Sequence, residues 1–274
     1  MAIQLAEKFS ALVDERFSTE AKSSLVVNKD YDFVGAHTIK IYSVGTAEMN
    51  DYGRNTAGTA RYGTPADLST EIQEVSMEKD RSFTFVIDKM DKDETLGALN
   101  AGSALSRQLR EVVMPEVDLY TFTKMSANAG TTKTETISED NAYDAITAGN
   151  EALDEAEVPV EGRTIITTPA FYTLLKKDGK AVLETEIGQD MRIRGVVANM
   201  DGANIQKLPS KLLPENTNFI LAHKVATTQA IKLADYKIHE DAPGVSGSLV
   251  EGRIYYTAFV RNNKKKAIYV SVSQ

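Results

Sequence analysis

The sequence predicts an α+β protein whose long helix and extended hairpin are not covered by the rest of the same chain. Residues 93–128 carry apolar side chains at intervals of three and four, as an amphipathic helix does. Apolar residues alternate with polar ones in residues 38–44 and 82–88, which is typical of half-buried strands. Between these strands, residues 50–69 contain almost no large aliphatic side chain before Leu68. Together these patterns indicate strands, a long helix and a projecting loop.

The composition excludes several classes of protein. The 274 residues are 42% hydrophobic and 26% charged, which suits a globular chain of one large domain or two small ones. The absence of cysteine excludes disulfide scaffolds, thiolate metal sites and thiol nucleophiles. A net charge of −8 argues against sequence-specific DNA recognition. No apolar run approaches the roughly 18–20 residues that span a bilayer. Because the N-terminus is unlike a secretory signal, we expect a protein made in a cytoplasm.

Residues 2–17 are the first expected element, an amphipathic helix. Its apolar stripe consists of Leu5, Phe9, Leu12, Val13 and Phe17. Nothing in residues 18–32 could cover this stripe, so the helix must dock elsewhere. Two alternatives fit the pattern: the stripe packs on the body of its own chain, or it packs on a neighbouring chain.

Residues 45–81 are the next expected element, and their middle, residues 50–69, is rich in Gly, Thr, Asn and Ala without large aliphatic side chains before Leu68. A compact domain rarely carries so long a stretch without core-forming residues, so it is either a disordered loop or a hairpin whose partner lies outside the monomer. A two-stranded hairpin alone is marginally stable in water, which favours an arm held by another subunit. Tyr and Arg are common at the centres of interfaces, so the expected anchors at the tip are Tyr52, Arg54, Arg61 and Tyr62. Solvated loop residues are the alternative for these four.

A helix over residues 93–128 would act as a spine rather than as a core element. Asp93 is its expected N-cap, and Pro115, which lacks a backbone donor, should bend or break it. If continuous, the helix is about 50 Å long at roughly 1.5 Å per residue, which exceeds the diameter of a compact domain of this size.

The rest of the chain mixes short strands and helices. Residues 131–135 read as a polar linker, and residues 163–168 predict a short buried strand. Thr168 followed by Pro169 predicts the start of a helix, after which residues 178–190 form a charged loop. The tail is β-rich, with expected strands at 230–233, 250–260 and 267–272.

No motif indicates catalysis. The histidines at positions 37, 223 and 239 lack the spacing of metal ligands or of a catalytic triad. The sequence has neither a phosphate-binding loop nor a dinucleotide fingerprint. Carboxylates are plentiful, so a soluble enzyme that uses an acidic pair remains an alternative, although no pair is singled out. We therefore expect no enzyme activity, no metal and no cofactor, and a structural protein that assembles with copies of itself.

Several long blocks, in one order along nearly the whole chain, resemble the major capsid proteins of tailed phages and prophages with the Hong Kong 97-like fold. These blocks are AEKFSALVDERF, NKDYDFVGAHTIKIYSV, MNDYGRN, RYGTPADL, EKDRSFTFVIDKMD, REVVMPEVDLYTFTKM, GNEALDEAEVPVEGRTIITTPAFYTLLKK and KLADYKIHEDAPGVSGSLVEGRIYYTAFV. The order of the blocks makes the resemblance more specific than any single motif. It implies an α+β Hong Kong 97-like capsid fold.

The resemblance also implies how the chain is divided. Its parts would be an N-terminal arm (1–33), an E-loop hairpin (34–92), a peripheral (P) domain with the spine helix (93–137), an axial (A) domain (138–225), P-domain strands (226–259) and a last A-domain strand (260–274). The arm would bury Leu5, Phe9, Leu12 and Phe17 between subunits. The charged loop would point toward the centre of a pentamer or hexamer and carries Lys180, Glu184, Glu186 and Asp190.

The function that the resemblance implies is that of a major capsid protein. Pentamers and hexamers would form an icosahedral phage head around double-stranded DNA, first as a procapsid that expands during packaging. The expected protein partners are other copies of the chain, a separate scaffolding protein and a portal, with a decoration protein as an optional addition. Packaged DNA would lie nearby without specific contacts. No membrane is expected as a partner. The protein would be assembled in the cytoplasm of the bacterial host and located in the virion. An encapsulin-type nanocompartment shell, which shares the fold and encloses enzymes, is the alternative.

Two departures from the family pattern refine these expectations. Some relatives carry a long N-terminal scaffolding segment that is later cleaved, whereas this sequence begins directly with the arm. We therefore expect any scaffold to be a separate protein. Some relatives form Lys–Asn crosslinks through the E-loop, but residues 41–78 contain no lysine. We therefore expect a non-covalent shell.

Overall fold

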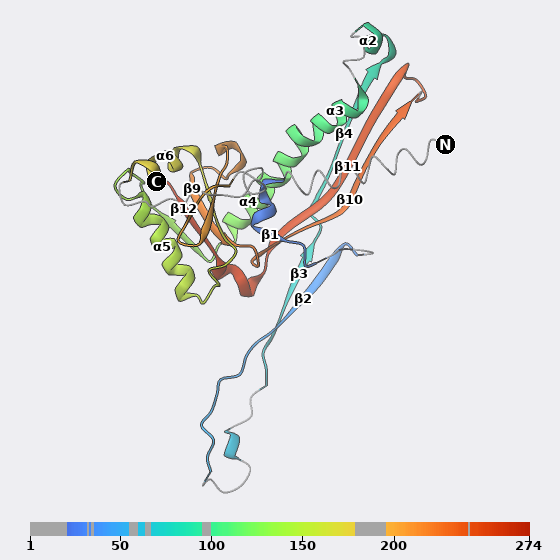
Figure 1. The fold of residues 1–274 in the computed structure, drawn as a ribbon. Coiled ribbons are helices and arrows are strands. Elements are labelled where there is room, and N and C mark those ends of the chain that lie inside the picture. Colours follow the sequence, from blue (N-terminus) through green and yellow to red (C-terminus); the bar gives the residue numbers. More distant parts are fainter. Residues whose placement is uncertain are drawn as a thin grey trace.

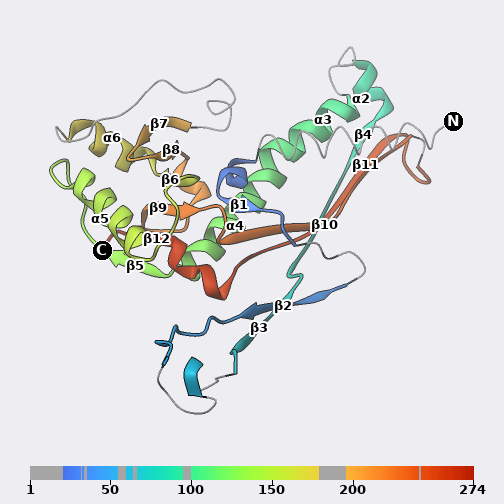
Figure 2. The same ribbon diagram turned by 60° about the horizontal axis from the view of Figure 1, so that its bottom comes forward.

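One long helix and two separate sheets organise the chain, and a thin hairpin projects from them (Figure 1). The computed structural model describes residues 21–31, 33, 36–54, 60–63, 67–94, 100–178, 196–240 and 242–274. The helix lies along the smaller sheet and ends under the larger one (Figures 1 and 2). It therefore joins two layered bodies that each have a core of their own.

The smaller sheet has four strands in the order β1-β10-β11-β4. Their bounds are Val27–Asn28 for β1, Thr227–Glu240 for β10, Gly247–Val260 for β11 and Lys79–Asp88 for β4. β10 and β11 form a long antiparallel hairpin, so the expected strand at residues 230–233 is much longer than the pattern indicated. Alternate residues of β10 and β11 face the helix and build a core with Leu105, Leu109, Val113 and Val117.

The long helix is continuous from Ala101 to Ala127 and passes through Pro115 without breaking. It consists of α3 (Ala101–Gln108), the π-helical turn η3 (Leu109–Val113) and α4 (Met114–Ala127). In the π-helical turn, the Met114 amide bonds to the Leu109 carbonyl, one residue further back than in an α-helix. The wider turn directly precedes the proline, whose missing donor would otherwise interrupt the α-helical ladder. Of the two expected effects of Pro115, a bend or a break, the break does not occur, and the α-helical pattern changes to a π-helical turn directly before the proline.

The start of this helix also differs from the prediction. Asn100 is the N-cap: its backbone is extended, and its side-chain oxygen accepts a hydrogen bond of 2.9 Å from the Gly102 amide. Asp93 lies instead inside a separate short helix, α2 (Lys89–Glu94). Asp and Asn both make good caps, so residue type alone does not separate Asp93 from Asn100.

The larger sheet has six strands in the order β5-β12-β9-β6-β8-β7. Their bounds are Thr131–Thr134, Ile268–Val272, Thr217–His223, Arg163–Thr167, Ala203–Lys207 and Val196–Met200. Helices α5 (Ala142–Glu155) and α6 (Pro169–Lys177) cover one face, where Ile165, Phe219 and Leu221 are buried. The neighbouring residues Ile166 and Ile220 point the other way and join a second core with α4. Both faces of this sheet are therefore covered, as its almost uninterrupted apolar strands require.

Two expectations for this body can now be judged. Thr168 caps α6 and accepts from the Phe171 amide, as predicted. The polar residues 131–134, expected as a linker, instead form the edge strand β5, which runs parallel to β12. Exposed Thr and Lys side chains at an edge give no apolar alternation, so the pattern concealed the strand.

A third, two-stranded sheet forms the projecting hairpin, with β2 (Thr38–Val44) paired antiparallel to β3 (Thr70–Ser76). Short 3-10 turns complete the chain: η1 (Lys22–Leu25), η2 (Ala60–Tyr62), η4 (Ser210–Leu212) and η5 (Asn262–Ala267). No helix among the described residues is long and apolar enough to cross a membrane.

Candidate subunit-contact surfaces

The hairpin has one buried and one open apolar face. Ile41 and Val75 on the first face are buried in a small core with Phe33 and Phe259. On the other face, Tyr42 lies directly opposite Ile72, and these side chains are 66% and 54% exposed. Val44 on the same strand is 65% exposed. A two-stranded ribbon with apolar residues on both faces lacks a cover for one of them, which is typical of a surface that another chain covers.

The tip of the hairpin brings the four predicted anchors into one small region. The rings of Tyr52 and Tyr62 are in edge-to-face contact, with centroids 4.9 Å apart. The Gly53 amide donates to the Arg61 carbonyl at 3.0 Å, which ties the two sides of the tip together. Tyr62 remains 81% exposed, and Arg54 and Arg61 are also exposed. The tip is thus structured within one chain while most of its surface stays open, and the role of the four residues as anchors remains a prediction.

The open face with Tyr42, Val44 and Ile72 was missed by the sequence analysis. Its signal was present: residues 38–44 read TIKIYSV, with apolar residues at odd positions and again at Tyr42 and Val44. The first set predicts the buried face, and the second set adds an apolar face on the opposite side of the strand. The other predicted contact residues, Leu5, Phe9, Leu12 and Phe17, lie outside the described residues, as do Lys180, Glu184, Glu186 and Asp190 of the charged loop.

Residues 22 and 23, near the start of the described chain, are fixed to the long helix. The buried carboxylate of Asp118 on α4 accepts hydrogen bonds from the backbone amides of Lys22 and Ser23, both at 3.0 Å. Burial raises the pKa of Asp118, although the hydrogen bonds from Ser23 and Lys22 act in the opposite direction. Gln229 of β10 extends the network by donating to the Thr121 hydroxyl at 3.1 Å. These hydrogen bonds therefore hold residues 22 and 23 rigidly against α4.

The root of the hairpin is held by a polar clamp at Glu78, between β3 and β4. Lys124 forms an ion pair with this carboxylate at 2.7 Å, and the Tyr120 hydroxyl donates to it at 2.9 Å. Partial burial alone would raise the pKa of Glu78, but the hydrogen bonds from Lys124 and Tyr120 and the charges of Lys124 and Lys79 lower it overall. Both partners lie on α4, so the clamp ties the direction of the hairpin to the helix.

Glu78→Gln should reduce the acid sensitivity of the protein. Because the folded-state pKa lies below the ordinary value of 4.5, the folded state takes up a proton less readily than the unfolded chain. The clamp thus contributes stability above that value and loses it as the pH falls through the folded pKa. The half-exposed pair contributes roughly 1 kcal/mol or less. Urea unfolding at neutral pH and below pH 4.5 should show a smaller loss for the variant; an equal loss in both proteins would contradict the clamp.

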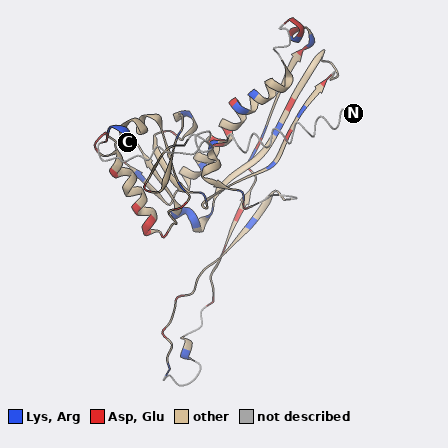
Figure 3. Cartoon of the chain, viewed as in Figure 1, with Lys and Arg blue, Asp and Glu red and all other residues tan. Residues whose placement is uncertain are grey.

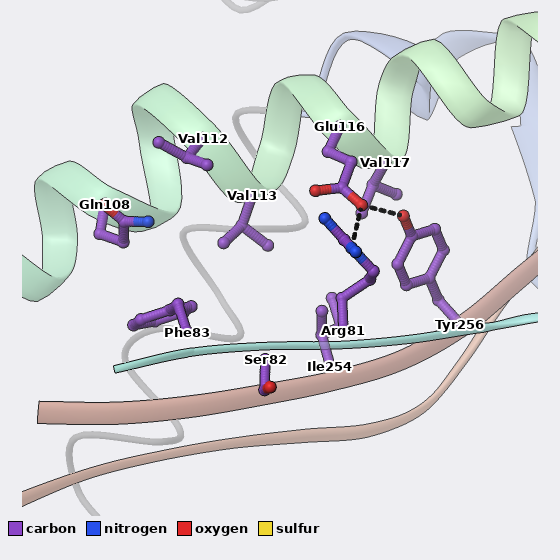
Figure 4. Close-up of a pocket in the computed structure, with 10 residues that line it drawn as sticks. All are labelled: Arg81, Ser82, Phe83, Gln108, Val112, Val113, Glu116, Val117, Ile254 and Tyr256. Carbon is purple, nitrogen blue, oxygen red and sulfur yellow. Dashed lines mark hydrogen bonds and ion pairs between the residues drawn. The ribbon is translucent and has the colours of Figure 1, made fainter. Parts of the chain in front are cut away.

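A cavity under the long helix offers no substrate site. It has a volume of about 90 Å³ and lies between η3, α4 and strands β4 and β11 (Figure 4). Arg81 reaches Glu116 at 2.7 Å, and the Tyr256 hydroxyl lies 3.4 Å from the same carboxylate. Small-molecule sites usually measure roughly 300–1,000 Å³. Its charged groups pair with each other, and the described residues contain no group of side chains that could hold a metal ion.

Comparison with known families identifies the family of the chain. The family model described as phage capsid protein matches residues 70–271, which is most of the chain. The chain belongs to the phage capsid protein family. This capsid protein is a structural component of the virion and not an enzyme, and it associates with copies of itself in the capsid lattice. A comparison with curated protein sequences gives no significant match.

Solved structures show that this capsid protein has the predicted fold. A chain from Mycobacterium phage Che8 superposes with a TM-score of 0.70 at 18% identity, over 91% of this chain and 90% of that chain. The capsid structure of the cyanophage P-SCSP1u gives 0.66 at 14% identity, over 91% and 86%. A virus-like particle from Pyrococcus furiosus gives 0.58 at 12% identity, over 97% and 99%. The α+β Hong Kong 97-like capsid fold is therefore confirmed.

Proposed function

We propose that this capsid protein forms the pentamers and hexamers of an icosahedral phage head that encloses double-stranded DNA. The observation that carries the proposal is the hairpin, whose open apolar face at Tyr42, Val44 and Ile72 is not covered by any of the residues that the structure describes. Burying such a face between subunits stabilises the contact by roughly 25 cal/mol for each Å² removed from water. Many contacts of this kind hold a closed shell together although each one is weak.

The parts of the chain take separate roles in this proposal. The arm (1–33) and the E-loop hairpin (34–92) lie over neighbouring subunits. Residues 93–137 and 226–259 form the P domain, and residues 138–225 with the final strand in 260–274 form the A domain. The loop with Lys180, Glu184, Glu186 and Asp190 faces the centre of each capsomer. The stripe of Leu5, Phe9, Leu12 and Phe17 is buried between chains.

The proposed partners follow from the same model. A separate scaffolding protein guides assembly, a portal occupies one vertex, and a decoration protein is an optional addition. Packaged DNA lies close to the inner wall without specific contacts, as suits a subunit with a net charge of −8. The shell is held without covalent crosslinks, because residues 41–78 contain no lysine.

An encapsulin-type nanocompartment is the second candidate function. The similarity to the virus-like particle from Pyrococcus furiosus favours it, since that match covers 97% of this chain. Its TM-score of 0.58 is lower than the 0.70 of the Che8 chain. Neighbouring genes separate the two functions: portal and terminase genes support a phage head, whereas a gene for a cargo enzyme with a targeting peptide supports the nanocompartment.

Cryo-electron microscopy of the purified chain, with and without residues 1–17, tests the proposed function. The full chain should form closed shells built from pentamers and hexamers, and should give a single band of 30.0 kDa on a denaturing gel. The truncated chain should give soluble subunits or small capsomers, because it lacks the apolar stripe. A full chain that stays monomeric at high concentration would contradict the proposal. Closed shells of normal size from the truncated chain would contradict the role of the arm.

A further inference from the structure

An acidic patch covers the end of α5 and the turn that follows it. Residues 134–162 contain nine acidic residues and neither lysine nor arginine. Glu151, Glu155, Glu157 and Glu161 are exposed at this end, and Figure 3 shows acidic segments along α5. No ion pair joins any of these four to a cation within the part of the chain that the structure describes. We call these four residues the α5 acidic patch.

The position of this patch is unfavourable within a single subunit. The C-terminal end of a helix carries partial negative charge, which disfavours further carboxylates there. The last turn of α5 contains no basic residue to compensate. Glu151 and Glu155 are also one turn apart on the same face, where like charges repel. A local conflict of this kind in an otherwise consistent fold is typical of a functional site.

The turn that carries part of the α5 acidic patch is nevertheless held rigidly by the buried side chain of Arg163. The buried guanidinium of Arg163 donates to the carbonyl oxygens of Val158 and Pro159, the latter at 3.1 Å. It also forms an ion pair with Asp154 at 2.6 Å, so the positive charge of Arg163 is paired with Asp154 and not with the four exposed glutamates. Lys224 lies beside the following turn, close to Gly162, and forms no ion pair with a described carboxylate. The exposed carboxylates therefore stand on a fixed frame and do not need to be ordered on binding.

A patch of opposite charge lies on η5. It consists of the consecutive residues Lys264, Lys265 and Lys266, which we call the η5 basic patch, and it appears as a basic segment in Figure 3. Over the described residues, none of the three forms an ion pair. The Gly130 amide donates to the Lys265 carbonyl at 2.8 Å, and a side chain at Gly130 would collide with that backbone. This patch, too, is fixed in place.

We propose that the α5 acidic patch of one subunit binds the η5 basic patch of a neighbouring copy of the same chain. The inference rests on the proposed self-assembly and assigns to it a specific contact. The two patches lie at the same end of the larger sheet, because α5 leads into β6, η5 leads into β12, and the first residues of both strands pair with the end of β9. A two-fold contact between copies would therefore place the acidic patch of each copy against the basic patch of the other. Within the described residues of one chain, no ion pair joins the two patches. Complementary charges of this kind mainly set the orientation and the correct partner face, while apolar contacts such as the hairpin face supply affinity.

Charge exchange tests this contact in the full-length protein. Glu151→Lys with Glu155→Lys should abolish particle formation, as should Lys264→Glu with Lys266→Glu, because each places like charges at the contact. Combining all four substitutions should restore particles. In a one-to-one mixture of the two double variants, contacts should form between unlike variants only, because a mixed pair brings opposite charges together. Glu215→Lys with Glu240→Lys is the control for the first double variant, because it changes the net charge by the same amount at other exposed positions. It should leave assembly intact.

The outcomes separate this contact from the proposed function. A wild-type chain that forms no particles contradicts self-assembly itself. If the wild type assembles and either double variant still forms particles at normal yield, the contact is wrong. It is also wrong if the fourfold variant unfolds at the wild-type temperature but does not assemble. If Lys264→Glu with Lys266→Glu forms normal particles that no longer retain DNA, the η5 basic patch binds nucleic acid. This result would also overturn the contact.

Discussion

Tyr42→Asp combined with Ile72→Asp should give a folded subunit that no longer forms shells. The two side chains face each other across the hairpin and are mostly exposed, so their loss removes little from the core of the subunit. In the shell, the same positions would place two charges in an apolar contact without partners, which is strongly unfavourable. Sedimentation and negative-stain images should show subunits or small oligomers in place of particles.

A conservative pair provides the matched control for this experiment. Tyr42→Phe with Ile72→Val keeps both positions apolar and should still give closed shells. Urea unfolding of the charged variant should match the wild-type subunit, which shows that the fold is retained. Normal shells from the charged variant would mean that the open face of the hairpin is not a subunit contact.

Phe122→Ala should cause the largest loss of stability among single substitutions considered for this chain. The ring of Phe122 is fully buried in the core where α4 meets Ile166 and Ile220 of the six-stranded sheet. Truncating a buried phenylalanine removes its apolar burial and leaves a cavity, with an expected cost of about 3–5 kcal/mol. This position also connects the long helix to the larger sheet, so the loss affects the joint between the two bodies.

The measurement is the free energy of unfolding in urea, with Leu119→Ala as the control on the same helix. Leu119 is 37% exposed, so its truncation should cost roughly 1 kcal/mol or less. A similar loss for both variants would show that the contact between α4 and the six-stranded sheet contributes little. Assembly of Phe122→Ala should fail at temperatures where the wild-type protein still forms shells.

The sequence predicted the elements whose patterns are local. The helix that Thr168 and Pro169 start, the alternating strand at residues 82–88 and the helical stripe from Leu105 to Val117 all depend on neighbouring residues and were placed correctly. Pro115 signalled an irregularity in the helix, but its form, a π-helical turn without a break, has no composition signal of its own. The edge strand β5 was missed because its pairing partner β12 lies more than 130 residues away.

The candidate contact surfaces were only partly predictable. Residues 50–69 lack core-forming side chains, and this showed that the hairpin projects. The identity of its open face required the strand register, which places Tyr42 opposite Ile72 and buries Ile41 on the other side. The α5 acidic patch required a helix boundary, because the unfavourable position of Glu151 and Glu155 exists only if the helix ends there. Periodicity places boundaries poorly, so such conflicts emerge only from coordinates.

The position of β12 inside the larger sheet has a consequence for protein synthesis. The strand contains some of the last residues of the chain, yet it lies between β5 and β9, with Tyr269 in one core and Val270 in the other. A nascent chain therefore cannot complete this sheet until β12 has been synthesised. A polypeptide that stops before β12 lacks an interior strand and leaves both cores open. We expect such a polypeptide to be unable to join a growing particle.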